Sequence, residues 1–122
     1  MKNSKLTLVL GASLKPERAS WKAVQLLRQK GHEVTAFGLR AGRIADVDIT
    51  TELPENQEIH TITLYLGPIN QLPYYDYILK VKPARLIFNP GTENPELYEK
   101  ARQAGIKTEY ACTLVLLTLN DY

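Results

Sequence analysis

The chain has 122 residues, 44% hydrophobic and 23% charged, with fifteen basic and thirteen acidic side chains. This length suits one domain, residues 1–122, with its own hydrophobic core. A net charge of +2 gives no argument for binding nucleic acid or an anionic membrane. The lone Cys112 excludes an internal disulfide and a cysteine metal cluster, and favours a reducing cytoplasm. Only about five apolar residues follow Met1–Lys5, too few for a signal-peptide core or a membrane span.

A continuous apolar, β-favouring run spans Leu6–Leu10 and ends at Gly11. Continuous apolar runs are typical of strands buried on both faces of a parallel sheet. The predicted strands are Leu6–Leu10, about Glu33–Phe37, Thr61–Leu66, Arg85–Phe88 and Ile106–Tyr110.

Helical spacing of apolar residues fills most intervals between these strands. Pro73 is compatible with the second predicted helix only in its first turn, and Asn94-Pro95 is typical of a helix start. The interval 38–44 is predicted as a loop, and 44–56 as a long connection with at most a short extended piece. The predicted helices run from Ser20 to a stop at Gly31, over Asn70–Val81, from Asn94-Pro95 to about Ala104, and over Cys112–Leu119.

Strands that alternate with helices at this spacing predict right-handed βαβ units. We therefore expect an α/β fold: an open, doubly wound parallel sheet of about five strands with helices on both faces, of the Rossmann or flavodoxin-like kind. In such folds the ligand site lies at the carboxyl ends of the strands.

The first loop, Gly-Ala-Ser at residues 11–13, leads from a strand to a helix and could hold a phosphate. Its glycine allows a sharp turn, its small residues let the backbone approach a pyrophosphate, and the Ser13 hydroxyl can donate to it. Ser20 is a candidate helix N-cap, and Arg18 and Lys22 supply positive charge nearby. The alternative is a tight turn with solvated charges.

Absent motifs exclude several other kinds of nucleotide site. The chain has no Gly-Lys-Ser/Thr triplet, so it carries no nucleotide-hydrolysing P-loop. A receiver domain needs carboxylates at the end of strand one, where this chain has 9–11, Val-Leu-Gly. An NAD site favours Asp or Glu at the tip of strand two, a position that Gly38 occupies. Arg40 and Arg43 beside it suit the 2′-phosphate of NADP or the 3′-phosphate of coenzyme A, unless both are merely solvated.

Four segments together closely resemble the small stand-alone CoA-binding domain family: "LVLGASLKPERASWKAVQLLRQKGHEV", "TLYLGPINQ", "RLIFNPGTENPEL" and "GIKTEYACTLVLL". The family fold is also that of the CoA-binding domain in the α-subunit of succinyl-CoA synthetase. The resemblance covers nearly the whole chain, and "FNPGTEN" preceded by "GAS" and "ER-S-K" is its most specific part.

The resemblance implies coenzyme A or acyl-CoA as ligand and assigns residues to its parts. After strand two the family usually has Asn-Pro and then Lys or Arg; here Gly38-Leu39-Arg40 keeps only the basic residue. By this match the diphosphate end is lined by Gly11, Ala12, Ser13, Arg18, Ser20 and Lys22, the nucleotide by Gly38, Arg40, Leu66, Gly67 and Pro68, and the rim towards the pantetheine arm by Asn89, Pro90 and Gly91.

No residues form an evident catalytic or metal-binding set. His32 is expected to be solvent-exposed, and His60 to be structural or idle. Cys112 is interpreted as a small buried cysteine near a helix start, and Glu93 as a residue of a turn near the ligand mouth. The tyrosines of 74–77 could stack a base, but helical spacing favours half-buried faces or an oligomer contact.

We therefore expect a protein that binds coenzyme A or an acyl-CoA without turnover, with no catalytic residue and no metal. One alternative is an NADP-type or acyl-CoA-using enzyme subunit. The other is a protein-interaction module with a degenerate nucleotide pocket. A homo-oligomer or an unknown partner protein stays open.

Overall fold

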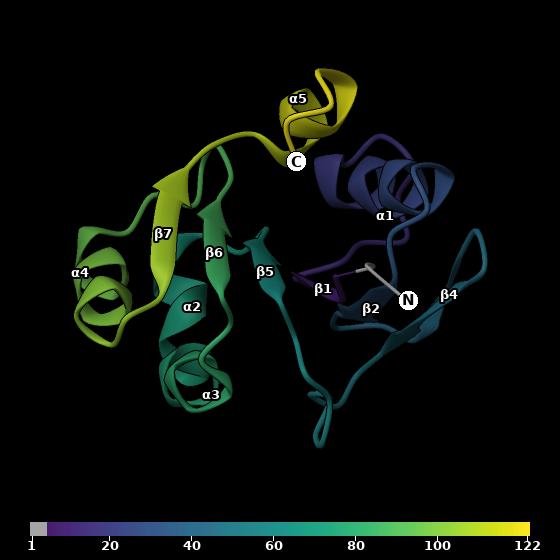
Figure 1. Ribbon diagram of the computed structural model, residues 1–122. Coiled ribbons are helices and arrows are strands. Elements are labelled where there is room, and N and C mark those ends of the chain that lie inside the picture. The colour runs from purple at the N-terminus through teal and green to yellow at the C-terminus, as the bar shows by residue number, and fades with distance from the viewer. Residues whose placement is uncertain (1–4) are drawn as a thin grey trace.

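The computed structural model describes residues 5–122. The prediction that the N-terminus is no signal peptide also involves residues 1–4, which lie outside the described residues. The strands are β1 (Thr7–Leu10), β2 (Val34–Phe37), β3 (Gly42–Ile44), β4 (Val47–Thr50), β5 (Thr61–Leu64), β6 (Arg85–Phe88) and β7 (Lys107–Tyr110). They form one sheet in the order β3-β4-β2-β1-β5-β6-β7, in which every neighbouring pair is parallel except β3 and β4 (Figure 1). The Rossmann-like α/β fold is confirmed, with seven strands instead of about five.

The two additional strands form a hairpin, with β3 in the interval predicted as a loop and β4 in the segment predicted as a long connection. Val47 and Ile49 are buried, whereas Asp48 and Thr50 are exposed, which is the alternation of a strand with one covered face. β4 extends the sheet by pairing with β2, with Ile49 opposite Ala36. The extended piece allowed in the connection is β4, whereas the prediction of a loop at β3 was wrong, because strands of three and four residues give only a weak sequence pattern.

The helices are α1 (Ala19–Gln29), α2 (Pro68–Gln71), the 3-10 turn η1 (Leu72–Tyr74), α3 (Tyr75–Val81), α4 (Pro95–Gln103) and α5 (Thr113–Thr118). The helix predicted at 70–81 thus starts at Pro68 and changes to a 3-10 turn around Pro73. A proline lacks the N–H of a regular helix interior, so its place at the start of η1 costs no hydrogen bond. Within residues 5–122, no helix combines the length and the apolarity that a membrane span needs.

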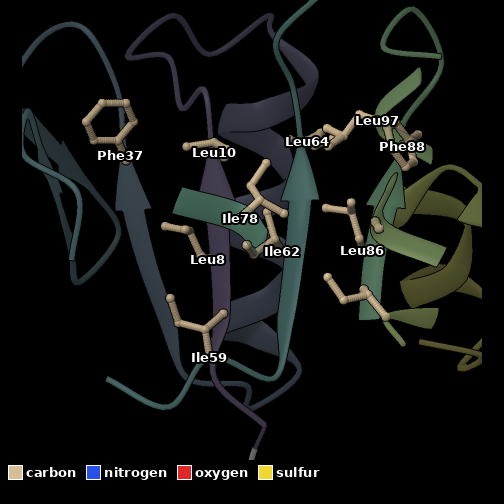
Figure 2. Close-up of a cluster of buried hydrophobic side chains, with 12 residues drawn as sticks. Leu8, Leu10, Phe37, Ile59, Ile62, Leu64, Ile78, Leu86, Phe88 and Leu97 are labelled. Carbon is tan, nitrogen blue, oxygen red and sulfur yellow. The ribbon is translucent and has the colours of Figure 1, made fainter. Parts of the chain in front are cut away.

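Helices cover both faces of the sheet (Figure 1). α1 and α5 pack together on one face, and α2, α3 and α4 cover the other. Along β1, Leu8 and Leu10 join the core beneath α3 and α4, whereas Val9 joins the core beneath α1 and α5. Figure 2 shows the first of these cores, in which Ile78 of α3 and Leu97 of α4 meet the strands.

The chain order places a ligand site at the centre of the sheet. From β1 the chain continues to β2 on one side, and it later returns to β5 on the other side of β1. At such a switch point the loops after adjacent strands diverge and leave a crevice at the carboxyl ends.

Candidate functional site

A cleft of about 650 Å³ lies at this switch point. Its walls come from the end of β2 and the loops that follow β1, β2 and β5, together with the start of α1 and Tyr74 of η1. The lining residues are Gly11, Ala12, Ser13, Leu14, Lys15, Arg18, Ala19, Ser20, Phe37, Gly38, Leu39, Arg40, Tyr65, Leu66 and Tyr74.

The loop after β1 is fixed to the end of β2 by its backbone. The N–H groups of Gly11 and Ala12 both donate to the carbonyl of Phe37, at 2.9 and 2.8 Å. Gly11 has a φ of +103°, a conformation that L side chains rarely adopt. The sharp turn predicted at this glycine therefore has a conformational basis.

Ser20 holds the same loop from the side of α1. Its Oγ accepts a hydrogen bond from the N–H of Ser13 at 3.0 Å, and the residue is only 4% exposed. Ser20 is the second residue of α1 and not its N-cap, so that prediction was wrong. The N-cap is Arg18, which has an extended backbone and makes no side-chain capping bond. No side chain at the N-cap therefore occupies the first-turn N–H groups of α1, which favour an anion.

The charges around the cleft favour an anion as well. Lys15, Arg18 and Arg40 are among the lining residues, and no acidic side chain is. The first turn of α1 also carries no acidic residue. Lys22 is exposed and lies outside the lining. A helix N-terminus adds its partial positive charge to these cations.

Gly38 forms a close contact between the two loops. A Cβ atom at this position would lie 2.3 Å from the carbonyl oxygen of Ala12. Arg40, two residues further along the chain, lines the cleft. Arg43 on β3 instead forms an ion pair with Asp48, with its Nε 2.9 Å from the carboxylate Oδ1. Of the two arginines predicted beside the ligand, the structure thus places only Arg40 at the cleft.

Tyr65 lines the cleft but was not singled out in the sequence. Its hydroxyl is buried and has no hydrogen-bond partner among the described residues 5–122. Burial raises the pKa of Tyr65 to about 12, so this hydroxyl stays protonated at physiological pH. Tyr65 directly follows β5, but the third strand was predicted to run on to Leu66, so no signal in the sequence indicated that this side chain faces the cleft.

The other predicted binding residues are divided among the main cleft, a neighbouring groove and the exposed loop after β6. Gly67 and Pro68 border a neighbouring groove of about 500 Å³, which Ile69, Leu72, Tyr75, Asn94 and Glu96 also line. Leu66 remains in the main cleft. Pro90 and Gly91 are exposed in the loop after β6 and line neither hollow.

Asn89 has a structural task that occupies its whole amide. Its Nδ2 donates to Thr63 Oγ1 at 2.6 Å and to the Leu64 carbonyl at 2.9 Å. Its Oδ1 accepts from the N–H of Thr113 at 2.8 Å. Asn89 is 2% exposed, and its hydrogen bonds join the end of β6 to β5 and α5. It therefore fixes the position of the rim and offers no free side-chain polar atom to a ligand.

The residues that suggested chemistry are dispersed. His60 Nδ1 lies 2.8 Å from Thr61 Oγ1, Glu93 accepts from the N–H of Gly91 at 3.0 Å, and Cys112 is the partly buried N-cap of α5. His32 is half-buried, with its ring centroid 4.9 Å from that of Tyr122, so the expectation of an exposed histidine was wrong. Burial lowers the pKa of His32. Residues 5–122 contain no group of three potential metal ligands.

Known proteins share both the sequence and this architecture. The family model of the CoA binding domain matches residues 5–118. The crystal structure of an uncharacterised protein is 41% identical, with a TM-score of 0.93, over 99% of this chain and 100% of that chain. A hypothetical protein from Pyrococcus horikoshii is 22% identical, with a TM-score of 0.82, over 93% of this chain and 81% of that chain. A comparison with curated proteins gives no match.

A larger enzyme contains the same fold. The dinucleotide forming acetyl-coenzyme A synthetase 1 of Ca. Korarchaeum cryptofilum, solved with phosphate and ADP, is 16% identical with a TM-score of 0.71. The match covers 87% of this chain and 25% of that chain. At this identity the likeness concerns the fold alone.

Proposed function

Because the chain belongs to the CoA-binding domain family, we propose that its cleft binds coenzyme A or an acyl-CoA without turning it over. The observation that carries the proposal is the cleft at the switch point, where the uncapped start of α1 meets three basic side chains and no acidic one. The lone cysteine fits a role in the reducing cytoplasm.

The diphosphate lies at the start of α1 in this proposal. The first-turn N–H groups supply donors, and Lys15 and Arg18 supply charge. The Ser13 hydroxyl accepts a hydrogen bond from the N–H of Lys15 at 3.1 Å, which leaves its own proton free to donate to a phosphate oxygen.

The adenosine lies towards the end of β2. Leu39, which is 87% exposed, together with Tyr74 offers an apolar surface to the base. Arg40 is the charge for the 3′-phosphate. The contact of Gly38 with Ala12 leaves no room for the carboxylate that an NAD site has at this position, so we expect NAD to bind poorly.

Titration calorimetry with coenzyme A, dephospho-CoA and NAD tests this assignment. A charge-assisted phosphate contact is worth about 1–3 kcal/mol, so coenzyme A should bind roughly tenfold or more tightly than dephospho-CoA. Arg40→Gln should remove this preference, whereas the matched Arg43→Gln, which alters an exposed ion pair with Asp48, should keep it. If the wild type bound coenzyme A and dephospho-CoA with equal affinity, the proposed contact with the 3′-phosphate would be wrong.

The absence of turnover is a separate part of the proposal. Cys112 is the side chain most able to react with the thiol end of the ligand, by disulfide exchange or acyl transfer. Wild type and Cys112→Ala should be incubated with acetyl-CoA and with CoA disulfide while thiol release and protein mass are followed over hours. We expect no turnover from either protein. Mass addition within minutes that requires Cys112 would overturn the binding-only proposal.

A further inference from the structure

A buried glutamine joins the two loops on the far side of the cleft. Gln71, the last residue of α2, is fully buried. Its Nε2 donates to the carbonyl of Leu66 and to the carbonyl of Thr92, both at 2.8 Å. Leu66 lines the cleft after β5, and Thr92 directly follows Pro90 and Gly91 in the loop after β6. One amide group thus connects the cleft wall to the exposed rim.

The oxygen of the Gln71 side-chain amide is hydrogen-bonded as well. Gln71 Oε1 accepts from Asn94 Nδ2 at 2.9 Å, and Asn94 caps α4 by accepting from the N–H of Leu97. Thr92 is held from its other side, because its N–H and its hydroxyl both donate to the Asn89 carbonyl, at 2.9 and 2.8 Å. The position of the rim loop therefore depends on Asn89 and on Gln71.

We propose that Gln71 is a positioning residue for the pantetheine arm of the ligand. The inference rests on the proposed function and on the rim at Pro90 and Gly91 that the family resemblance assigns to the arm, with the arm passing from the diphosphate between Leu66 and that rim. Gln71 touches no ligand itself and sets the separation of the two walls. Without its donors the buried Thr92 carbonyl and the partly buried Leu66 carbonyl lose their partner, and the loops must move apart to reach water.

A pair of ligands separates this role from a general role in stability. Coenzyme A contains the arm, whereas 3′-phosphoadenosine 5′-diphosphate is the same nucleotide without it. Gln71→Met keeps the length of the side chain and removes all its hydrogen bonds. Gln71→Glu keeps the acceptor for Asn94, but its ionised form places charge against two carbonyl oxygens. Ile78→Ala is the control, because it opens a cavity in the adjacent α3, at a fully buried position, without touching the amide.

Each ligand is titrated against each folded variant, and folding is checked by circular dichroism. We expect Gln71→Met to bind coenzyme A at least roughly tenfold more weakly, with the affinity for the shorter nucleotide within about twofold of wild type. The Ile78→Ala variant should keep the wild-type ratio of the two affinities. An equal loss for both ligands, no loss for either, or the same ratio change in Ile78→Ala overturns the inference. If the wild type binds neither ligand, the proposed function itself fails.

The acidic variant gives a second test that does not need Gln71→Met to fold. Burial raises the pKa of a carboxyl group at this position, and only the protonated form can donate to a carbonyl. Between pH 8 and pH 6, Gln71→Glu should regain part of its preference for coenzyme A, with each ratio normalised to wild type at the same pH. A normalised ratio that is constant with pH overturns the inference.

Discussion

The two walls of the cleft use their polar groups in opposite ways. The first wall, formed by the loop after β1 and the start of α1, leaves helix N–H groups and basic side chains open towards the cleft. The second wall, formed by the loop after β5 and held from behind by the loop after β6, uses the amides of Gln71, Asn89 and Asn94 to bind its own backbone and side chains. The difference suggests that the first wall supplies the attraction for the diphosphate and the second supplies shape.

The largest effect is expected where the first wall meets β2. Gly38→Asp places a Cβ within 2.3 Å of the Ala12 carbonyl oxygen, and neither backbone segment can yield without moving the loop. We expect a loss of about 3 kcal/mol in the free energy of unfolding and no detectable binding of coenzyme A. Urea denaturation and calorimetry measure the two effects.

A glycine in the second wall is the matched control for this substitution. A Cβ at Gly67 would meet nothing within 4 Å, and its φ of −64° suits any residue. Gly67→Ala should therefore leave the free energy of unfolding within about 0.5 kcal/mol of wild type. If Gly38→Asp were as stable as Gly67→Ala, the contact between the two loops would not constrain the site.

A smaller effect is expected at the tip of the first loop. Ser13→Tyr should fold and lose coenzyme A affinity by roughly a hundredfold or more, because the ring fills the space for the diphosphate. Ser13→Ala removes one hydroxyl donor and should cost only roughly twofold to fivefold, since the helix N–H groups remain. Calorimetry on both variants measures which substitution costs more affinity for coenzyme A, and circular dichroism checks that both variants fold. Wild-type affinity in Ser13→Tyr would place the ligand elsewhere.

The same contrast explains which parts of the site could be predicted. The first wall is contiguous in sequence, so the residue pattern alone assigns Gly11 and Arg18 to one strand–turn–helix unit. The network of the second wall forms only when Gln71 meets Thr92, 21 positions along the chain. Nothing local marks a glutamine for that contact.

For the fold too, most strands could be predicted from the sequence, whereas the pairing of the β3–β4 hairpin could not. All five predicted strands are present in the sheet, and Leu6–Leu10 is the clearest apolar run among them. The β3–β4 hairpin depends on pairing with β2, which tertiary structure supplies. The N-cap of α1 was predicted at Ser20, two positions after the actual N-cap, Arg18. Arg18 is extended and makes no side-chain capping bond, so it lacks the feature by which a sequence pattern identifies an N-cap.

Backbone amide chemical shifts followed by NMR during a titration with coenzyme A test the central claim most directly. The account predicts that the largest changes occur at the first-turn amides of α1, Ala19 to Trp21, and at Arg40, while Asp48 on the β3–β4 hairpin stays unchanged. Changes confined to the neighbouring groove at Ile69 and Leu72, with the start of α1 unaffected at saturation, would contradict it.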